Sequence, residues 1–211
     1  MAPTPRGTTI PPEAPGFPAE IPSPATLADL HAVMIRCTRC DLFLSRTQVV
    51  PGTGSLRPSL FFVGEAPGAT EDREGIPFVG ASGRLLDSML ESAGVSREDV
   101  FIGNVVRCRP PENRNPKGYE IRACAGWLAE QIRLLRPQLV VSLGRFALQH
   151  FIPKGKITQL QGTVQEVEYG SARLRLVPLL HPAAVLRDPR LRDSYRQQFS
   201  ELVVLASEGP R

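Results

Sequence analysis

Short apolar runs alternate with longer amphipathic segments along most of this chain. The runs at 60–63, 100–106 and 139–143 are rich in branched and aromatic apolar residues, which indicates buried strands. The segments at 164–168 and 173–180 predict a hairpin whose second strand is also buried. These runs predict a sheet whose strands are mostly apolar and buried.

Between the strands, apolar residues recur every three or four positions, which is the spacing of one helix face. We expect helices over 25–36, 82–93, 119–135, 145–151 and 194–206. Strands that alternate with helices favour the α/β class, with a parallel sheet covered on both faces. In such sheets ligands bind beyond the carboxyl ends of the strands. The candidate site is therefore formed by the positions just past the strands: 64–68, Asn104, Gly144 and His181.

Composition limits the class of protein. The chain has 211 residues, 42% hydrophobic and 22% charged, as expected for one compact globular domain. Eight of its 21 prolines lie in residues 1–25 with only three charged residues, which predicts a disordered tail before a single domain over 26–207. Neither a secretory signal nor a bilayer-spanning apolar run is present, so we expect a soluble, cytoplasmic protein with no membrane partner.

The formal net charge of +4 is only mildly basic, but the arginines are clustered. One group includes Arg107, Arg109 and Arg114, and a second lies between 173 and 196. Arginine suits phosphate recognition because its planar guanidinium offers a fork of donors. Nucleic-acid binding and a codon-driven excess of arginine explain the clusters equally well until motifs are considered.

Four cysteines are spaced unevenly along the chain. Cys37 and Cys40 form a C-x2-C pair after the first predicted helix, Cys108 follows the second strand and Cys124 lies in the long helix. Disulfides are not expected without an export signal, and arginines beside three of these cysteines would favour the thiolate form that binds metal. One tight pair with two dispersed partners fits a 4Fe–4S cluster better than structural zinc, which usually joins two tight pairs. Spacing alone favours the cluster and leaves zinc, or four unrelated buried thiols, open.

The segment at 64–80, GEAPGATEDREGIPFVG, is rich in glycine and in carboxylates. Its glycines and prolines predict a tight loop in which backbone amides approach a ligand closely. It lacks the pattern of a phosphate-binding P-loop, and its carboxylates would repel a phosphate. They suit hydrogen bonding to a base edge or the positioning of a water, with a solvated acidic loop as the alternative.

The segments GEAPGATEDREGIPFVG, GNVVRCRPPENRNP and LLHPAAVLR, together with the cysteines, resemble the family 4 uracil-DNA glycosylases. The resemblance extends from Leu27 to Ala206, with the motifs in order. It implies an α/β/α sandwich around a central, mainly parallel four-stranded sheet, and a monomeric enzyme that removes uracil from single- or double-stranded DNA to begin base excision repair. It also implies a 4Fe–4S cluster bound by four residues: Cys37, Cys40, Cys108 and Cys124.

The resemblance assigns roles in recognising the base. Uracil has to leave the base stack and enter a pocket before its glycosidic bond can be reached. Phe78 matches the residue that stacks on the base, and Asn104 matches the amide that reads O4 and N3–H, which requires both a donor and an acceptor. His181 matches the donor to O2, where negative charge builds as the bond breaks. Asn104 alone would be interpreted as a turn residue.

Three further candidates lie in the glycine-rich segment at 64–80, which we call the first loop. By resemblance, Glu71 crowds C5 of the base and excludes the methyl group of thymine, while Glu65 organises the loop or its water. Ala66 is counted among the uracil-binding positions and stands where the best-known uracil glycosylases have an aspartate that positions the attacking water. Because that aspartate is absent, we assign no single general base.

DNA contacts are expected from two segments. The segment PAAVLR at 182–187 resembles the loop that enters the minor groove, with Leu186 as an apolar wedge and Arg187 beside it for phosphate or base contact. The alternative is that Val185 and Leu186 belong to the core. Three arginines are expected to bind the DNA backbone and to make binding salt-dependent: Arg107, Arg109 and Arg114.

Three other activities are considered. A relative of this family traps uracil covalently through a histidine in a basic insert after the first motif, but here Ser82 and Gly83 follow GIPFVGA directly, which favours turnover. A sister glycosylase with broader choice would also accept hypoxanthine or ethenocytosine, against which the glutamate and asparagine pattern argues. A non-catalytic iron–sulfur module for DNA binding or electron transfer would not need Phe78, Asn104 and His181 together.

Overall fold

The computed structural model describes residues 21–170 and 172–208, so most of the predicted tail at 1–25 lies outside the described residues. The strands are β1 (Thr53–Gly54), β2 (Leu60–Gly64), β3 (Phe101–Asn104), β4 (Leu139–Leu143), β5 (Gln165–Tyr169) and β6 (Ala172–Leu179). The α-helices are α1 (Leu27–Met34), α2 (Ala69–Glu74), α3 (Ala81–Ser92), α4 (Gly118–Leu135), α5 (Gly144–Phe151), α6 (Ile157–Leu160), α7 (Pro182–Arg187) and α8 (Arg192–Ser207). Short 3-10 helices are η1 (Asp41–Leu44), η2 (Arg97–Asp99), η3 (Pro111–Asn113) and η4 (Pro189–Leu191). In the two described stretches, none of the helices combines the length and the apolar character needed to cross a bilayer.

The strands form one sheet in the order β1-β3-β2-β4-β6-β5. The four central strands run parallel, and β1 and β5 pair antiparallel at the two edges. The predicted α/β class and mainly parallel sheet are confirmed, whereas the predicted four-stranded sheet is corrected to six strands. The edge strands explain the difference: β1 has only two residues with no apolar pattern, and β5 is the outer strand of the predicted hairpin.

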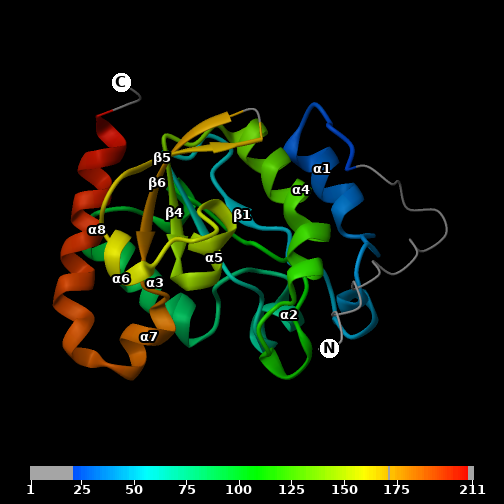
Figure 1. The fold of residues 1–211 in the computed structure, drawn as a ribbon, viewed down its shortest axis with the longest axis horizontal. Helices are drawn as coiled ribbons and strands as arrows, with labels where there is room; N and C mark the ends of the chain where they lie inside the picture. The colour runs from blue at the N-terminus through cyan, green and yellow to red at the C-terminus, as the bar shows by residue number, and fades with distance from the viewer. Residues whose placement is uncertain (1–20, 171, 209–211) are drawn as a thin grey trace, which may run out of the picture.

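Helices cover both faces of the sheet. Alternate residues of β2 point to opposite sides, so that Phe61 packs in one buried cluster with Trp127 of α4, and Phe62 packs in the other with Phe199 of α8. The first cluster also contains residues of α1 and α5, and the second contains residues of α3 and α7. Figure 1 shows α8 and α3 on one side of the sheet and α4 and α1 on the other. The fold is therefore a three-layer α/β/α sandwich.

Most predicted elements are present with small shifts at their ends. β4 coincides with the predicted strand, and α4 begins one residue earlier than predicted. The strand predicted over 100–106 ends at Asn104, because the next two residues leave the ladder and their N–H groups donate to the carbonyls of Gly64 and Glu65. Three short α-helices were not predicted, α2, α6 and α7, and the last replaces an expected loop. Two of them, α2 and α7, begin shortly after the carboxyl ends of β2 and β6.

Candidate active site and cysteine site

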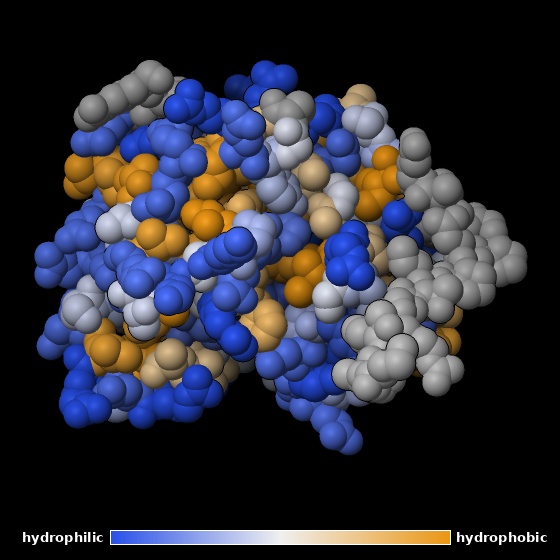
Figure 2. Space-filling model, in the orientation of Figure 1, coloured by the Kyte–Doolittle hydropathy of each residue, from blue (hydrophilic) through white to orange (hydrophobic). Residues whose placement is uncertain are grey.

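A cavity of about 300 Å³ lies at the carboxyl edge of the parallel strands. It is bounded by the loop after β2, the end of β3 and His181, two residues beyond β6, as expected for a ligand site in a sheet of this kind. We call it the edge pocket, and its lining residues are Ala66, Gly68, Ala69, Thr70, Glu71, Phe78, Gly80, Ala81, Ser82, Asn104 and His181. Figure 2 shows that the surface is indented at the lower edge, between the parts formed by α7 and α2.

Asn104 is a buried amide that faces the edge pocket. Only 1% of the residue is exposed, and neither Oδ1 nor Nδ2 has a hydrogen-bond partner within the described part of the chain. A Cβ at Gly64 would lie 2.4 Å from Oδ1 of Asn104 and 2.6 Å from the ring of Phe78, so only glycine at 64 lets both side chains approach. Buried polar groups are normally satisfied. An unsatisfied donor and acceptor side by side therefore indicate a ligand that supplies both partners.

Phe78 is held in a backbone conformation that bulky residues rarely adopt, with φ of 53°. Neighbouring contacts fix this conformation: Nη2 of Arg97 donates to the carbonyl of Pro77 at 2.5 Å. A Cβ at Gly83 would lie 1.8 Å from the carbonyl oxygen of Phe78, so α3 can begin against this loop only with glycine there. Strain of this kind persists where the surroundings determine it, and it is common at binding sites.

Glu71 connects the two halves of the first loop. Its carboxylate accepts hydrogen bonds from the N–H groups of Gly68, at 3.1 Å, and of Val79 and Gly80, at 3.1 and 2.8 Å. The two N–H groups of the second half come directly after Phe78, so the peptide units on both sides of that ring are anchored. Glu71 also lines the edge pocket. Its observed contacts are those of a residue that positions the loop.

His181 lies opposite Phe78, with ring centroids 5.7 Å apart and ring planes inclined by 33°. Burial is the main cause that lowers the pKa of His181 to about 4, assisted by the charge of Arg187 and opposed by that of Glu71. Its Nδ1 accepts a hydrogen bond of 3.2 Å from the N–H of Ala183 in the first turn of α7. A neutral imidazole that accepts at Nδ1 carries its proton on Nε2. His181 is therefore a neutral donor.

The structure brings five of the predicted site residues together around the edge pocket: Ala66, Glu71, Phe78, Asn104 and His181. Glu65 is half-buried nearby but is not part of the lining. Burial raises the pKa of Glu65, and the charge of Arg145 opposes that rise. The lining residues that sequence reasoning missed include Thr70 and Ser82. The only signal for them was their position within or directly after the glycine-rich segment.

A second pocket is lined by all four cysteines, together with residues of the segment after α1, of α4 and of the segment after β3. Cys37, Cys108 and Cys124 are buried, and Cys40 is half-buried. Sulfur atoms from one tight pair and two distant positions thus meet at one place, as a four-thiolate cluster requires. No three His, Cys, Asp or Glu side chains of the described residues are arranged to hold a single metal ion.

Burial and the arginines act on these thiols in opposite directions. Burial raises the pKa of Cys40 to about 12 and also raises the pKa values of Cys108 and Cys124. Nη1 of Arg46 donates to Sγ of Cys108 at 3.2 Å and opposes the rise there, and the charge of Arg107 opposes the rise at Cys124. Arginines near the cysteines therefore favour the thiolate form, as expected from the sequence, whereas loss of water favours the thiol.

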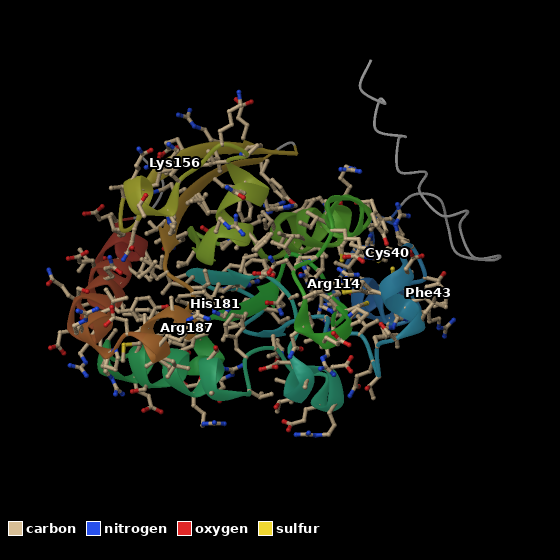
Figure 3. All side chains as sticks on the ribbon, turned by 60° about the horizontal axis from the view of Figure 1, so that its bottom comes forward. Cys40, Phe43, Arg114, Lys156, His181 and Arg187 are labelled. Atoms are coloured by element: carbon tan, nitrogen blue, oxygen red, sulfur yellow. The ribbon has the colours of Figure 1, made fainter. Side chains whose placement is uncertain are left out.

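The segment predicted to enter the minor groove is the helix α7. Val185 is buried in the core, whereas Leu186 is 46% exposed and Arg187 is also exposed. Figure 3 shows His181 and Arg187 close together, with Cys40 and Arg114 on the other side of the molecule. Val185 and Leu186 are neighbours on α7, but the first is in the core and the second is in solvent.

The three predicted DNA-binding arginines have different surroundings. Arg107 is 1% exposed, so its predicted contact with the DNA backbone is corrected: the side chain turns into the core beside the cysteines. Arg114 makes two hydrogen bonds, of 2.6 and 2.9 Å, to the carboxylate of buried Glu120, which occupies its guanidinium. Arg109 is half-buried, and its Nε donates to the side chain of Asn113. Of the three, only Arg109 lies near the surface without a buried partner among the described residues.

Comparisons with known proteins agree with this geometry. Residues 51–203 match the family model of the uracil DNA glycosylase superfamily. A type-4 uracil-DNA glycosylase of Archaeoglobus fulgidus is 42% identical over 182 residues, which cover 84% of this chain and 92% of that protein. A type-4 enzyme of Thermotoga maritima is 42% identical over 153 residues, covering 72% of this chain and 79% of the relative. A type-5 uracil-DNA glycosylase of Thermus thermophilus is 38% identical, over 47% of this chain and 52% of the relative.

The family model spans both strands that border the edge pocket and the histidine beyond β6. The type-4 relatives match over a larger share of the chain than the type-5 relative does. The chain belongs to the uracil DNA glycosylase superfamily and, within it, to the type-4 uracil-DNA glycosylases.

Proposed function

We propose that this chain is a DNA repair enzyme that hydrolyses the N-glycosidic bond of uracil in DNA, with the flipped base held in the edge pocket. The observation that carries the proposal is the buried amide of Asn104, whose donor and acceptor lack partners among the described residues and border the cavity. Uracil offers an acceptor, O4, next to a donor, N3–H, and so complements one amide side chain. Phe78 supplies an aromatic face for the flat ring.

The chemistry rests on charge that develops in the leaving base. As the bond breaks, uracil becomes an anion and the sugar becomes cationic. The Nε2–H of neutral His181 donates to O2 of the base, in the manner of an oxyanion hole. A neutral donor suits this role because it stabilises the anion without protonating it. The backbone phosphates of the DNA stabilise the sugar cation in addition.

Selection against thymine belongs to the first loop in this proposal. Glu71 acts as a positioning residue, because its carboxylate fixes the peptide units around Phe78. A loop fixed in this way stays close to C5 of the base and cannot move away to make room for a methyl group. Leu186, exposed on α7 near the pocket, fills the space that the flipped base leaves, and Arg187 contacts the DNA backbone.

The cysteine site is proposed to hold a 4Fe–4S cluster through Cys37, Cys40, Cys108 and Cys124. The convergence of four cysteines on one pocket supports this assignment. A bound cluster would keep the four thiols ionised and connect α1, the segment after β3 and α4. We assign the cluster no step in the hydrolysis.

Excision can be tested with oligonucleotides that contain uracil, hypoxanthine or no damage, followed by alkaline cleavage at abasic sites. We expect abasic sites from uracil alone. Asn104→Leu should lower the single-turnover rate by about 100-fold or more, since it removes a donor to an oxygen that takes up charge. The exposed Asn115→Leu serves as the matched control and should leave the rate unchanged.

The same assay separates the other activities. Cleavage at hypoxanthine as readily as at uracil would indicate a broader glycosylase, and stoichiometric capture of the DNA without turnover would indicate a covalent trap. If the triple variant of Phe78, Asn104 and His181 released uracil at the wild-type rate, the edge pocket would not be the active site. α3 begins at Ala81, directly after the first motif, which is consistent with turnover.

A further inference from the structure

Arg107 is the only buried arginine among the described residues, and its guanidinium lies in the core beside the cysteines. Its Nη2 donates to Oε1 of Gln131, whereas Nε and Nη1 have no hydrogen-bond partner in the described part of the chain. A buried cation without a counter-charge is strongly destabilising, and such groups are normally paired. The position therefore calls for an anion.

No carboxylate provides that anion in the described structure. The groups around Arg107 that can carry negative charge are Cys124, Cys108 and Tyr169. Burial raises the pKa of Tyr169 so far that it is neutral. The nearby His31 is also neutral, since burial and the charge of Arg107 lower its pKa to about 4. The remaining candidates are cysteine sulfurs.

Both the backbone and the side chain of Arg107 are held in place next to the cysteine site. It precedes Cys108 in the chain and lines the same pocket as the four cysteines. Its backbone forms a hydrogen bond with Cys124, and its carbonyl accepts the N–H of Val50. The side chain is anchored at its far end by Gln131, which is itself wholly buried. The charge is therefore fixed in position and little screened by water.

We propose that Arg107 is the internal counter-ion of the iron–sulfur cluster, so that its charge raises the reduction potential of the cluster and slows the loss of iron. The proposal rests on the cluster assignment made above. Four thiolates and the cluster carry net negative charge, and such charge is most strongly stabilised by a cation in a medium of low dielectric. The same pairing removes the cost of burying an unpaired guanidinium.

The test compares the purified full-length holoprotein of Arg107→Met with Arg133→Met, a matched change at an exposed arginine of α4. The measurements are iron per chain, the reduction potential by protein-film voltammetry and the rate of iron release to a chelator. We expect Arg107→Met to have a more negative potential and to release iron about tenfold faster or more, as found when partners of metal ligands are removed. Arg133→Met should match the wild type in all three.

A second pair of variants separates charge from structure and decides the case if Arg107→Met does not fold. Gln131→Glu keeps the oxygen that accepts from Arg107, loses the donor to the carbonyl of Pro51 and adds a charge that neutralises the guanidinium, whereas Gln131→Met removes both hydrogen bonds without adding charge. A counter-ion role predicts that Gln131→Glu lowers the potential and that Gln131→Met leaves it close to the wild-type value. A purely structural role predicts the same potential for both.

The outcomes distinguish this inference from the proposed function. Equal potentials in Gln131→Glu and Gln131→Met, or a wild-type potential in Arg107→Met, would overturn the counter-ion role and leave the cluster in place. A wild-type chain that contains no iron and sulfide would overturn both the cluster and its counter-ion. Uracil excision, measured on the same preparations, is judged separately in either case.

Discussion

Single residues of the edge pocket combine strain and unsatisfied polarity that a purely structural site would avoid. The left-handed backbone at Phe78 costs about 1–3 kcal/mol. Leaving the buried amide of Asn104 without partners costs about 1–3 kcal/mol for each unsatisfied group. Both costs fall on residues that line one cavity, where a bound base would satisfy the amide and stack on the ring. The fold therefore holds this site ready for a ligand.

His181 allows a prediction about both rate and pH. His181→Ala should lower the single-turnover rate of uracil excision about 100-fold to 1,000-fold, because the Nε2–H donor to the leaving base is lost. Burial lowers the pKa of His181 to about 4 from an ordinary value of 6.5. The neutral imidazole therefore persists down to about pH 4, and the rate of the wild type should show no inflection near 6.5.

The pH profile of single-turnover excision, measured on the wild type and His181→Ala, checks this prediction. His150→Ala is the control, since that histidine contacts Tyr169 on the other face of the sheet and is absent from the pocket lining. A wild-type rate that rises or falls through pH 6.5 and becomes flat in His181→Ala would show that the imidazole titrates normally and would refute the neutral donor.

At this scale the sequence could indicate which residues lie at strand ends but not which way each side chain turns. Asn104 and His181 were predictable because they lie at, or two residues beyond, the carboxyl ends of buried strands of a parallel sheet. Arg107 was not, because its side chain turns inward beside the cysteines only through tertiary packing beyond the end of β3. Nothing in the local sequence distinguishes this buried arginine from Arg109, two positions later.

The helix α7 presents neighbouring residues to opposite environments. It begins after His181, whose Nδ1 accepts the N–H of Ala183 and so connects the start of the helix to the edge pocket. Val185 faces the core and is 2% exposed, and Leu186 faces solvent. Exposure alone does not distinguish Leu186, because Leu44 and Leu56 are more exposed, but its place on the helix that follows His181 puts it beside the proposed site.

We therefore expect Leu186→Ala to impair excision from double-stranded DNA far more than from single-stranded DNA. An apolar wedge matters only where a base has to be unstacked from a duplex. Val185→Ala, one residue away, should instead lower the free energy of unfolding by about 1–2 kcal/mol through loss of buried apolar surface. Single-turnover rates on the two substrates and denaturant unfolding of both variants give the comparison. Equal losses of Leu186→Ala on both substrates would exclude a wedge.

The elements that the sequence predicted well are the long, strongly periodic ones. α4 and β4 have apolar patterns that only one kind of element satisfies, and both were placed within one residue. The elements that were missed, β1, α2, α6 and α7, are short, and short segments have weak patterns of their own. α2, for example, has a mainly polar sequence, and it is held in place by the N–H of Thr47, which donates to the buried carboxylate of Asp72.

The whole molecule places two pockets at different parts of one sheet. The edge pocket lies at the carboxyl edge and is lined by residues of α2 and α3, whereas the cysteine site is lined by the segment after α1, the segment after β3 and α4. The two sites are close along the chain, because Asn104 ends β3 and Cys108 follows four residues later. A short piece of chain therefore connects the edge pocket to the cysteine site.

Electrostatic attraction to DNA is a property of the whole molecule, because charged side chains over the whole surface contribute to the free energy of binding. Binding to DNA should weaken with salt, and the slope of log K against log salt should fall by about one for each phosphate contact removed. We expect this change for Arg109→Gln and Arg187→Gln, which lie near the surface, and none for Arg114→Gln, whose guanidinium is bound to Glu120. Fluorescence anisotropy across a salt series measures the slopes. Arg133→Gln, near the end of α4 and the amino ends of the strands, is the control.

Acid stability is a property of the whole chain that follows from its three histidines. Burial is the largest cause that lowers the pKa of each of them, His31, His150 and His181, from 6.5 to about 4. The unfolded chain takes up protons as the pH falls below 6.5, whereas the folded chain takes them up only near pH 4. The unfolded state then binds more protons, so the free energy of unfolding falls as the pH decreases through that interval and is independent of these groups above it.

Denaturant unfolding at a series of pH values between neutrality and pH 4 measures this dependence. His150→Gln removes one titrating group while keeping a side chain that can hydrogen-bond Tyr169, so its stability should fall less steeply than that of the wild type over the same interval. The difference between the two curves isolates one histidine from the carboxylates that titrate at the acid end. Parallel curves would mean that His150 has an ordinary pKa, and hence that water reaches the interior between α5 and the β5–β6 hairpin.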